Sequence, residues 1–148
     1  MSDFGILHLS DLHFGAHHRF QREPVDLADS ILDDLRDRLH LGEVINFIII
    51  TGDIAEWAME TEFAHARLFL LHLLEELHVD LDHLLIVPGN HDVNWKLCEA
   101  YFLECEARNI EPQQPFEAKY RFFDEFMQGL YGRIVDPWPQ IRDFPDHG

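Results

Sequence analysis

The sequence predicts an α/β fold in which mainly parallel strands alternate with helices in a βαβαβ core. Three apolar runs rich in β-branched residues lie near residues 4–10, 44–51 and 83–87, and turn-forming residues follow each run. Such a run is typical of a strand that is buried on both faces of a parallel sheet. Two stretches with apolar residues at helical spacing separate the runs. The length of 148 residues suits a single domain with a substantial core.

The first helix is expected over residues 24–40, because Pro24 suits a first helical turn and Gly42 stops the helix soon afterwards. The second helix is expected over residues 60–78. Its apolar residues lie at helical spacing: Phe63, Ala64, Leu68, Leu71, Leu74 and Leu77. Units of this kind almost always make right-handed crossovers onto a parallel sheet.

Beyond the third strand, helices are expected over residues 95–108 and 115–131, and the remaining stretch has no clear periodicity. In the first of these helices Cys98 and Cys105 would lie about 10 Å apart, at ~1.5 Å per residue. That separation exceeds the roughly 7 Å limit for a disulfide. Reduced, buried cysteines and the absence of a visible signal segment favour a cytoplasmic protein. No apolar stretch is long enough to span a bilayer.

The charge of the chain argues against a nucleic-acid-binding protein. The formal net charge is -17, from 28 acidic and 11 basic residues. A surface this acidic repels a phosphate backbone, so a nuclease is also disfavoured unless a partner supplies a basic surface. A bound metal ion could still attract a single phosphate group.

Each apolar run ends in a short polar block. The blocks contain six candidate site residues: Asp11 and His13 after the first run, Asp53 after the second, and Asn90, His91 and Asp92 after the third. Ligands of open α/β sheets bind beyond the carboxyl ends of the strands, so we expect these side chains to converge. Mn²⁺, Fe²⁺ and Zn²⁺ accept mixed carboxylate, amide and imidazole ligands. The blocks therefore predict a centre for divalent metal ions.

The first two blocks suggest how such ions would be held. Asp11 and His13 are two positions apart, so in an extended strand end their side chains would point to one side. Asp53 follows Gly52, which allows the backbone to turn sharply. The two carboxylate oxygens of Asp53 could bridge two ions, which lie about 3.5–4 Å apart in hydrolytic two-metal sites. Asn90 offers a neutral carbonyl ligand to the second ion.

The remaining residues of the third block suggest acid catalysis. His91 would project toward the substrate, where its imidazole could protonate a leaving-group oxygen. Asp92 would fix the tautomer of that imidazole and raise its pKa. Polar residues after strands also cap helices and form turns, so one block alone would carry little weight.

The three blocks, in this order and each after a strand, resemble the calcineurin-like metallophosphoesterase superfamily. Residues 7–15 (LHLSDLHFG) are similar to its bacterial phosphodiesterase-type members, and the resemblance covers residues 6–92. It implies a four-layer α/β/β/α sandwich, of which this chain would form the front half. In the family, a hydroxide that bridges two metal ions attacks phosphorus, and the histidine of the Asn-His pair assists the leaving group.

Carried over residue by residue, the resemblance assigns one ion to Asp11, His13 and Asp53. It assigns the other ion to Asp53 and Asn90, and acid catalysis to His91. The substrate implied is a phosphate ester, and the cofactors are two divalent ions of manganese, iron or zinc.

The family completes both coordination spheres with later histidines, two of them in a Gly-His-x-His block. No such block occurs here, and His147 is the only histidine after His91. We therefore expect residues 1–148 to form a single, C-terminally incomplete domain, with a downstream domain or a homo-oligomer as its partner. The alternative is a truncated or degenerate phosphoesterase fold that serves as a non-catalytic scaffold or regulatory module.

Other histidines have simpler interpretations. His8 lies within the first strand and is predicted to be a buried imidazole. His65 and His72 are seven positions apart on the second helix, with no third ligand evident, so they are predicted to be surface or core-edge residues. His17 and His18 are predicted to lie in a solvated loop, with contact to the substrate as the alternative.

Overall fold

A parallel three-stranded sheet forms the centre of the computed structural model, which describes residues 4–15, 23–40, 43–113 and 117–132. The strands are β1 (Gly5–Leu9), β2 (Ile45–Thr51) and β3 (Leu84–Val87), and they lie in the order β1-β2-β3. Helix α1 (Pro24–Arg38) connects β1 to β2, and α2 (Glu60–Leu77) leads toward β3. The parallel βαβαβ core predicted from the sequence is confirmed, with each element within two residues of its expected bounds at either end.

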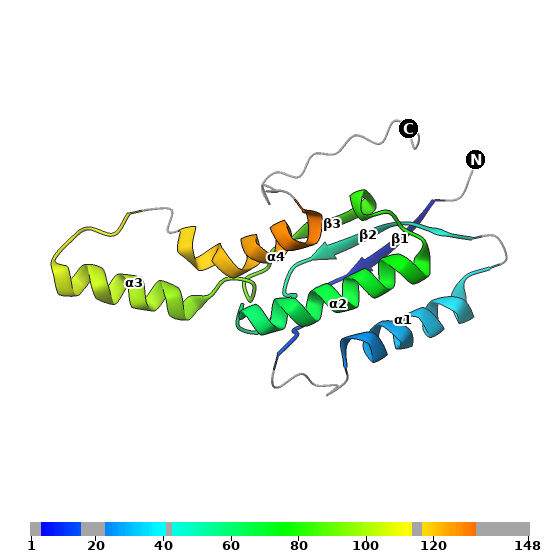
Figure 1. Cartoon of the computed structure of the whole chain (residues 1–148), viewed down its shortest axis with the longest axis horizontal. Coiled ribbons are helices and arrows are strands. Elements are labelled where there is room, and N and C mark those ends of the chain that lie inside the picture. The colour runs from blue at the N-terminus through cyan, green and yellow to red at the C-terminus, as the bar shows by residue number, and fades with distance from the viewer. Residues whose placement is uncertain (1–3, 16–22, 41–42, 114–116, 133–148) are drawn as a thin grey trace.

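Three helices pack together around the hydrophobic core. Figure 1 shows α2 between α1 and α4 (Arg121–Tyr131), with the sheet behind it. The core contains fully buried side chains from β2, β3, α2 and α4: Ile48, Ile50, Leu84, Ile86, Phe69, Leu70, Leu73, Phe123 and Met127. In β2 and β3 the fully buried side chains occupy alternate positions and so share one face of the sheet, while Phe47 of β2 is buried on the other face.

The opposite face of the sheet is more open than the sequence predicts. Ile6 is 49% exposed, and His8 is exposed with its Nε2 atom 2.7 Å from the hydroxyl oxygen of Thr51. The expectation that the strands are buried on both faces is therefore wrong for β1, and so is the expectation of a buried His8. An isoleucine-rich run suits a strand that buries one face as well as one that buries two, so the run alone does not distinguish them. The four-layer sandwich stays a prediction.

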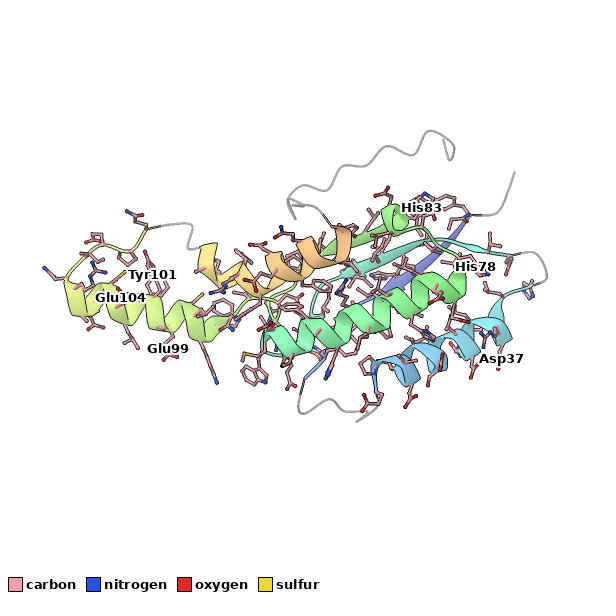
Figure 2. The ribbon with its side chains drawn as sticks, in the orientation of Figure 1. Asp37, His78, His83, Glu99, Tyr101 and Glu104 are labelled. Carbon is pink, nitrogen blue, oxygen red and sulfur yellow. The ribbon has the colours of Figure 1, made fainter. Side chains whose placement is uncertain are left out.

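Helix α3 (Trp95–Arg108) extends away from the sheet (Figure 1) and has the bounds predicted for it. Glu99 and Glu104 lie on its exposed surface, far from the sheet (Figure 2). Cys98 and Cys105 are the buried residues of α3, and both are free thiols, as predicted.

The helix expected over residues 115–131 is divided in the structure. A 3₁₀ helix, η2 (Glu117–Tyr120), comes first, and α4 begins only at Arg121. The aromatic periodicity that predicted one helix is therefore real only from Arg121 onward, where Phe123 and Phe126 are buried. Of the helices that the structure describes, none combines the length and the apolar composition that a bilayer span requires.

Candidate metal centre

The register of the sheet brings the three polar blocks to one edge. In the parallel pairing, Leu9 at the end of β1 lies opposite Ile50, and Thr51 at the end of β2 lies opposite Val87. All three strands therefore end at nearly the same level, and the segments that follow them leave the sheet side by side.

Backbone hydrogen bonds hold the segments after β1 and β2 together. The amide of Asp11 donates to the carbonyl of Gly52 (3.2 Å), and the amide of His13 donates to the carbonyl of Asp53 (2.9 Å). Ligand atoms of Asp11, His13 and Asp53 consequently lie within 4.8 Å of one another. The predicted convergence of these three side chains is confirmed.

The backbone of these three residues is left-handed, not extended. The φ angles are 56° at Asp11, 47° at His13 and 53° at Asp53. Aspartate, asparagine and histidine are the non-glycine residues most often found in this conformation. The spacing argument from an extended strand end is therefore wrong in detail, because Asp11 and His13 follow the strand and are brought together by the loop.

The third block closes against Asp53. The amide of His91 donates to Oδ1 of Asp53 (2.9 Å). A Cβ atom at position 89 would lie 2.2 Å from the same oxygen, so only glycine allows this approach. The rings of His13 and His91 meet edge to face, with their centroids 4.7 Å apart. His91 therefore lies beside the three converging side chains.

The donor set of Asp11, His13 and Asp53 fits a divalent cation. Two carboxylates and one imidazole are ligands that manganese, iron and zinc accept. The side chains of Asp11 and His13 are 68% and 37% exposed, so an ion could reach them from solvent. The hydroxyl of Ser10 donates to Oδ2 of Asp11, which leaves Oδ1 on the side of His13 Nε2, 3.9 Å away.

A family model described as calcineurin-like phosphoesterase matches residues 4–148. The chain belongs to the calcineurin-like phosphoesterase family. This membership implies a metal-dependent phosphoesterase, in which Asp11, His13 and Asp53 could bind metal. The resemblance to the superfamily is thereby confirmed. No curated protein matches the chain.

In this family member, Asn90 lies on the loop between β3 and α3, next to His91. Asn90 is exposed, and its backbone carbonyl accepts a hydrogen bond from Nε1 of Trp95 (3.0 Å). The indole of Trp95 thus holds this loop through a backbone carbonyl. The assignment of the Asn90 side chain to a second ion stays a prediction.

Asp92 contacts the backbone of the loops after β2 and β3. Its carboxylate is fully buried and accepts hydrogen bonds from the amides of Ala55 and Gly89, both at 2.8 Å. Burial raises the pKa of Asp92, although these two hydrogen bonds act in the opposite direction. The two oxygens of Asp92 therefore join the loops after β2 and β3. Among the described residues Asp92 makes no hydrogen bond to the His91 ring, so the expectation that Asp92 orients His91 gains no support.

The partner of the His91 ring is the backbone of Glu56. Nδ1 of His91 lies 2.8 Å from the Glu56 carbonyl oxygen. Glu56 is not among the residues predicted from the sequence, because any residue type can supply a backbone carbonyl. Only the loop fold after β2 places this oxygen beside the imidazole.

Two other histidines considered in the sequence lie on α2, and three lie outside the described residues. His72 pairs with Asp29 of α1 at 2.7 Å, and His65 is exposed, so the prediction of surface or core-edge residues is confirmed for both. His17, His18 and His147 lie outside the described residues.

Proposed function

We propose that the chain is a metal-dependent phosphodiesterase with a two-ion centre. The observation that carries this proposal is the grouping of Asp11, His13 and Asp53 within 4.8 Å, beside His91, in a chain of this family. Asp11, His13 and Asp53 would hold one ion, and Asp53 and Asn90 would hold the other. Divalent ions in such a centre supply Lewis acidity and an activated water molecule.

Asp53 is the residue on which both ion sites depend. Its Oδ1 atom already accepts the amide hydrogen of His91. An ionised carboxylate offers about four lone-pair positions, so this hydrogen bond leaves capacity for metal ligation on both oxygens. The same hydrogen bond would hold the third block at a fixed distance from the metal ligands.

His91 is suited to transfer a proton to the leaving alcohol. Because a carbonyl oxygen can only accept, the contact with Glu56 places a proton on Nδ1 of His91. Nε2 is then the nitrogen that can exchange a proton with a substrate. The contact also fixes the ring orientation, which is the role that the sequence assigns to Asp92.

The first experiment measures hydrolysis of bis-p-nitrophenyl phosphate with and without Mn²⁺. Asp53→Asn removes the carboxylate charge shared by both sites and should abolish the Mn²⁺-dependent rate. The matched control is Asp37→Asn on the exposed end of α1 (Figure 2), which should retain it. Full activity in Asp53→Asn would overturn the proposal.

The diesterase assignment is tested by comparing kcat/KM for that diester with kcat/KM for p-nitrophenyl phosphate. A higher value for the monoester would show a phosphomonoesterase. His91→Ala should slow a phenyl ester, which has a poor leaving group, more than a nitrophenyl ester. Equal losses of rate on both esters, with Mn²⁺ binding unchanged, would show that His91 is not the acid catalyst.

A non-catalytic phosphoesterase fold is the second candidate function. One observation favours it: in the described part of the chain, the second ion would have only Asp53 and Asn90 as protein ligands. Mn²⁺ binding without turnover of either ester would support this candidate.

A further inference from the structure

A cavity of about 490 Å³ lies beside the proposed metal centre. Gly15, Trp57, Met59, Trp95 and Lys96 are among the residues that line it. Three are large apolar side chains and one is a cation. None of them is a candidate metal ligand or the proposed acid, so the metal centre does not account for this cavity.

Chain connections and hydrogen bonds join the cavity to the metal centre. Trp57 directly follows Glu56, whose carbonyl lies against His91 Nδ1. Trp95 donates its indole N–H to the carbonyl of Asn90 (3.0 Å). A phosphoester with its phosphorus at the metal centre would therefore have one of its ester groups near the cavity.

The two indoles are exposed although the surrounding backbone is well held. Trp57 is 55% and Trp95 is 60% exposed, and within the described residues neither ring contacts another aromatic ring. The amides of Trp57 and Met59 both donate to Oε2 of buried Glu62, at 3.0 Å. Large aromatic faces on a fixed backbone are suited to bind a flat aromatic ring, because burial and ring stacking both favour the contact.

Lys96 adds a positive charge to the cavity. Four arginines in the described part of the chain form ion pairs with carboxylates: Arg36, Arg38, Arg108 and Arg121. Lys96 is exposed and has no such pair among the described residues. Glu62 also lines the cavity, but its carboxylate accepts the two amides described above. In a chain with a net charge of -17, an unpaired cation here favours an anionic ligand.

We propose that this cavity binds the flat aromatic ring of an anionic phosphoester, with the ring against Trp57 and Trp95 and a negative charge near Lys96. The identification of this ligand as the substrate rests on the proposed function. The aromatic ring could belong to a simple aryl ester or to a nucleotide, and both share the chemistry that the cavity recognises.

The test is NMR of the tryptophan indole N–H groups of the full chain in chelator, where no turnover occurs. The probes are phenyl phosphate, adenosine monophosphate and methyl phosphate, which carries the same charge without a ring. Of the three indole signals of the chain, those of Trp57 and Trp95, assigned with Trp→Phe variants, should shift with the two aromatic probes. Shifts of equal size with methyl phosphate, or no shifts at all, would overturn the proposal.

Variants separate the ring contact from the charge. Trp57→Ala should weaken phenyl phosphate binding about tenfold, as expected for loss of a stacking surface. Phe102→Ala is the matched control, because Phe102 is an exposed aromatic of α3 outside the cavity. Lys96→Gln should weaken phenyl phosphate but not phenol, whereas Lys119→Gln should change neither. Unchanged binding in both Trp57→Ala and Lys96→Gln would overturn the proposal.

The same probes distinguish an aryl ester from a nucleotide as the ligand, and they distinguish the cavity proposal from the proposed function. Adenosine monophosphate binding ten times more tightly than phenyl phosphate would identify a nucleobase site, and equal affinities would identify an aryl site. Indole shifts without Mn²⁺-dependent turnover would support the cavity while the proposed function fails. Turnover with no indole shift, and with unchanged KM in Trp57→Ala, would support the function while the cavity proposal fails.

Discussion

Helices α2 and α3 are both long helices of the same chain, yet they have opposite relations to the core. Seven of the 18 residues of α2 are buried, against two of the 14 residues of α3. Phe102 and Leu103 of α3 are 42% and 58% exposed. Apolar residues in a helix therefore do not by themselves show that the helix stabilises the fold.

The attachment of α3 explains its different role. Asn94 caps the helix by accepting a hydrogen bond from the amide of Leu97 (3.0 Å), and its Nδ2 donates to the carbonyl of Ala58 (3.2 Å). The next residue, Trp95, holds the Asn90 loop. The first turn of α3 is thus part of the surroundings of the metal centre, while the rest of the helix extends away from the core.

The largest difference should come from removing one phenylalanine from each helix. Phe69→Ala in α2 removes a fully buried ring whose centroid lies 5.3 Å from the ring centroid of Phe14. The expected loss in the free energy of unfolding is about 3–5 kcal/mol. Phe102→Ala in α3 should change it by less than about 0.5 kcal/mol. Urea denaturation in chelator measures both, and comparable losses would show that α3 belongs to the cooperative core.

A smaller loss is expected where the loops around the metal centre are joined. Asp92→Asn leaves one of the amides of Ala55 and Gly89 facing an NH₂ group, so stability should fall by about 1–3 kcal/mol. Mn²⁺ affinity should fall as well, because the loop that carries Asn90 loses its anchor. The exposed Asp37→Asn is the control for the change of charge. An unchanged unfolding midpoint in Asp92→Asn would contradict the role of Asp92 in joining the loops after β2 and β3.

Two glycine-to-alanine substitutions are expected to change the stability of the chain in opposite directions. Gly89→Ala forces a methyl group against Asp53 and should destabilise the chain by about 1–3 kcal/mol. Gly129→Ala lies within α4, where an added Cβ meets nothing within 4 Å, and should stabilise it by about 0.5–1 kcal/mol. Thermal unfolding of the two variants checks both signs, and equal shifts would rule out a special constraint at position 89.

A local effect is expected at the junction between α3 and the site. Asn94→Ala removes the cap and should cost about 1 kcal/mol. Amide hydrogen exchange should increase in the first turn of α3 and stay slow in α2, because the cap acts locally. Equal increases in both helices would show that the two are coupled.

The sequence predicts the parts of the site that depend on strand ends. Asp11, His13 and Asp53 follow apolar runs, and the carboxyl ends of parallel strands meet at one edge, so their convergence can be derived from residue types and order alone. The same reasoning locates His91 next to them. These positions follow from the secondary structure, which the apolar pattern determines.

The parts that depend on packing between loops cannot be derived in this way. Which buried group Asp92 meets is decided by how the segments after β2 and β3 close on each other. The carbonyl of Glu56 carries no signal in residue type. His8 is exposed although it lies within an apolar run, because such a run does not report whether one face or both faces of a strand are covered.

The left-handed backbone at Asp11, His13 and Asp53 gives the site a conformational cost. Each such residue other than glycine is disfavoured by roughly 1 kcal/mol or more. Glycine at Asp11 would relieve the backbone there but delete a ligand. The chain therefore exchanges folding stability for the placement of its ligands, and a bound cation would return part of that stability by binding only the folded state. In this family member, the edge of the sheet that carries the candidate metal ligands is also where the backbone has this conformational cost.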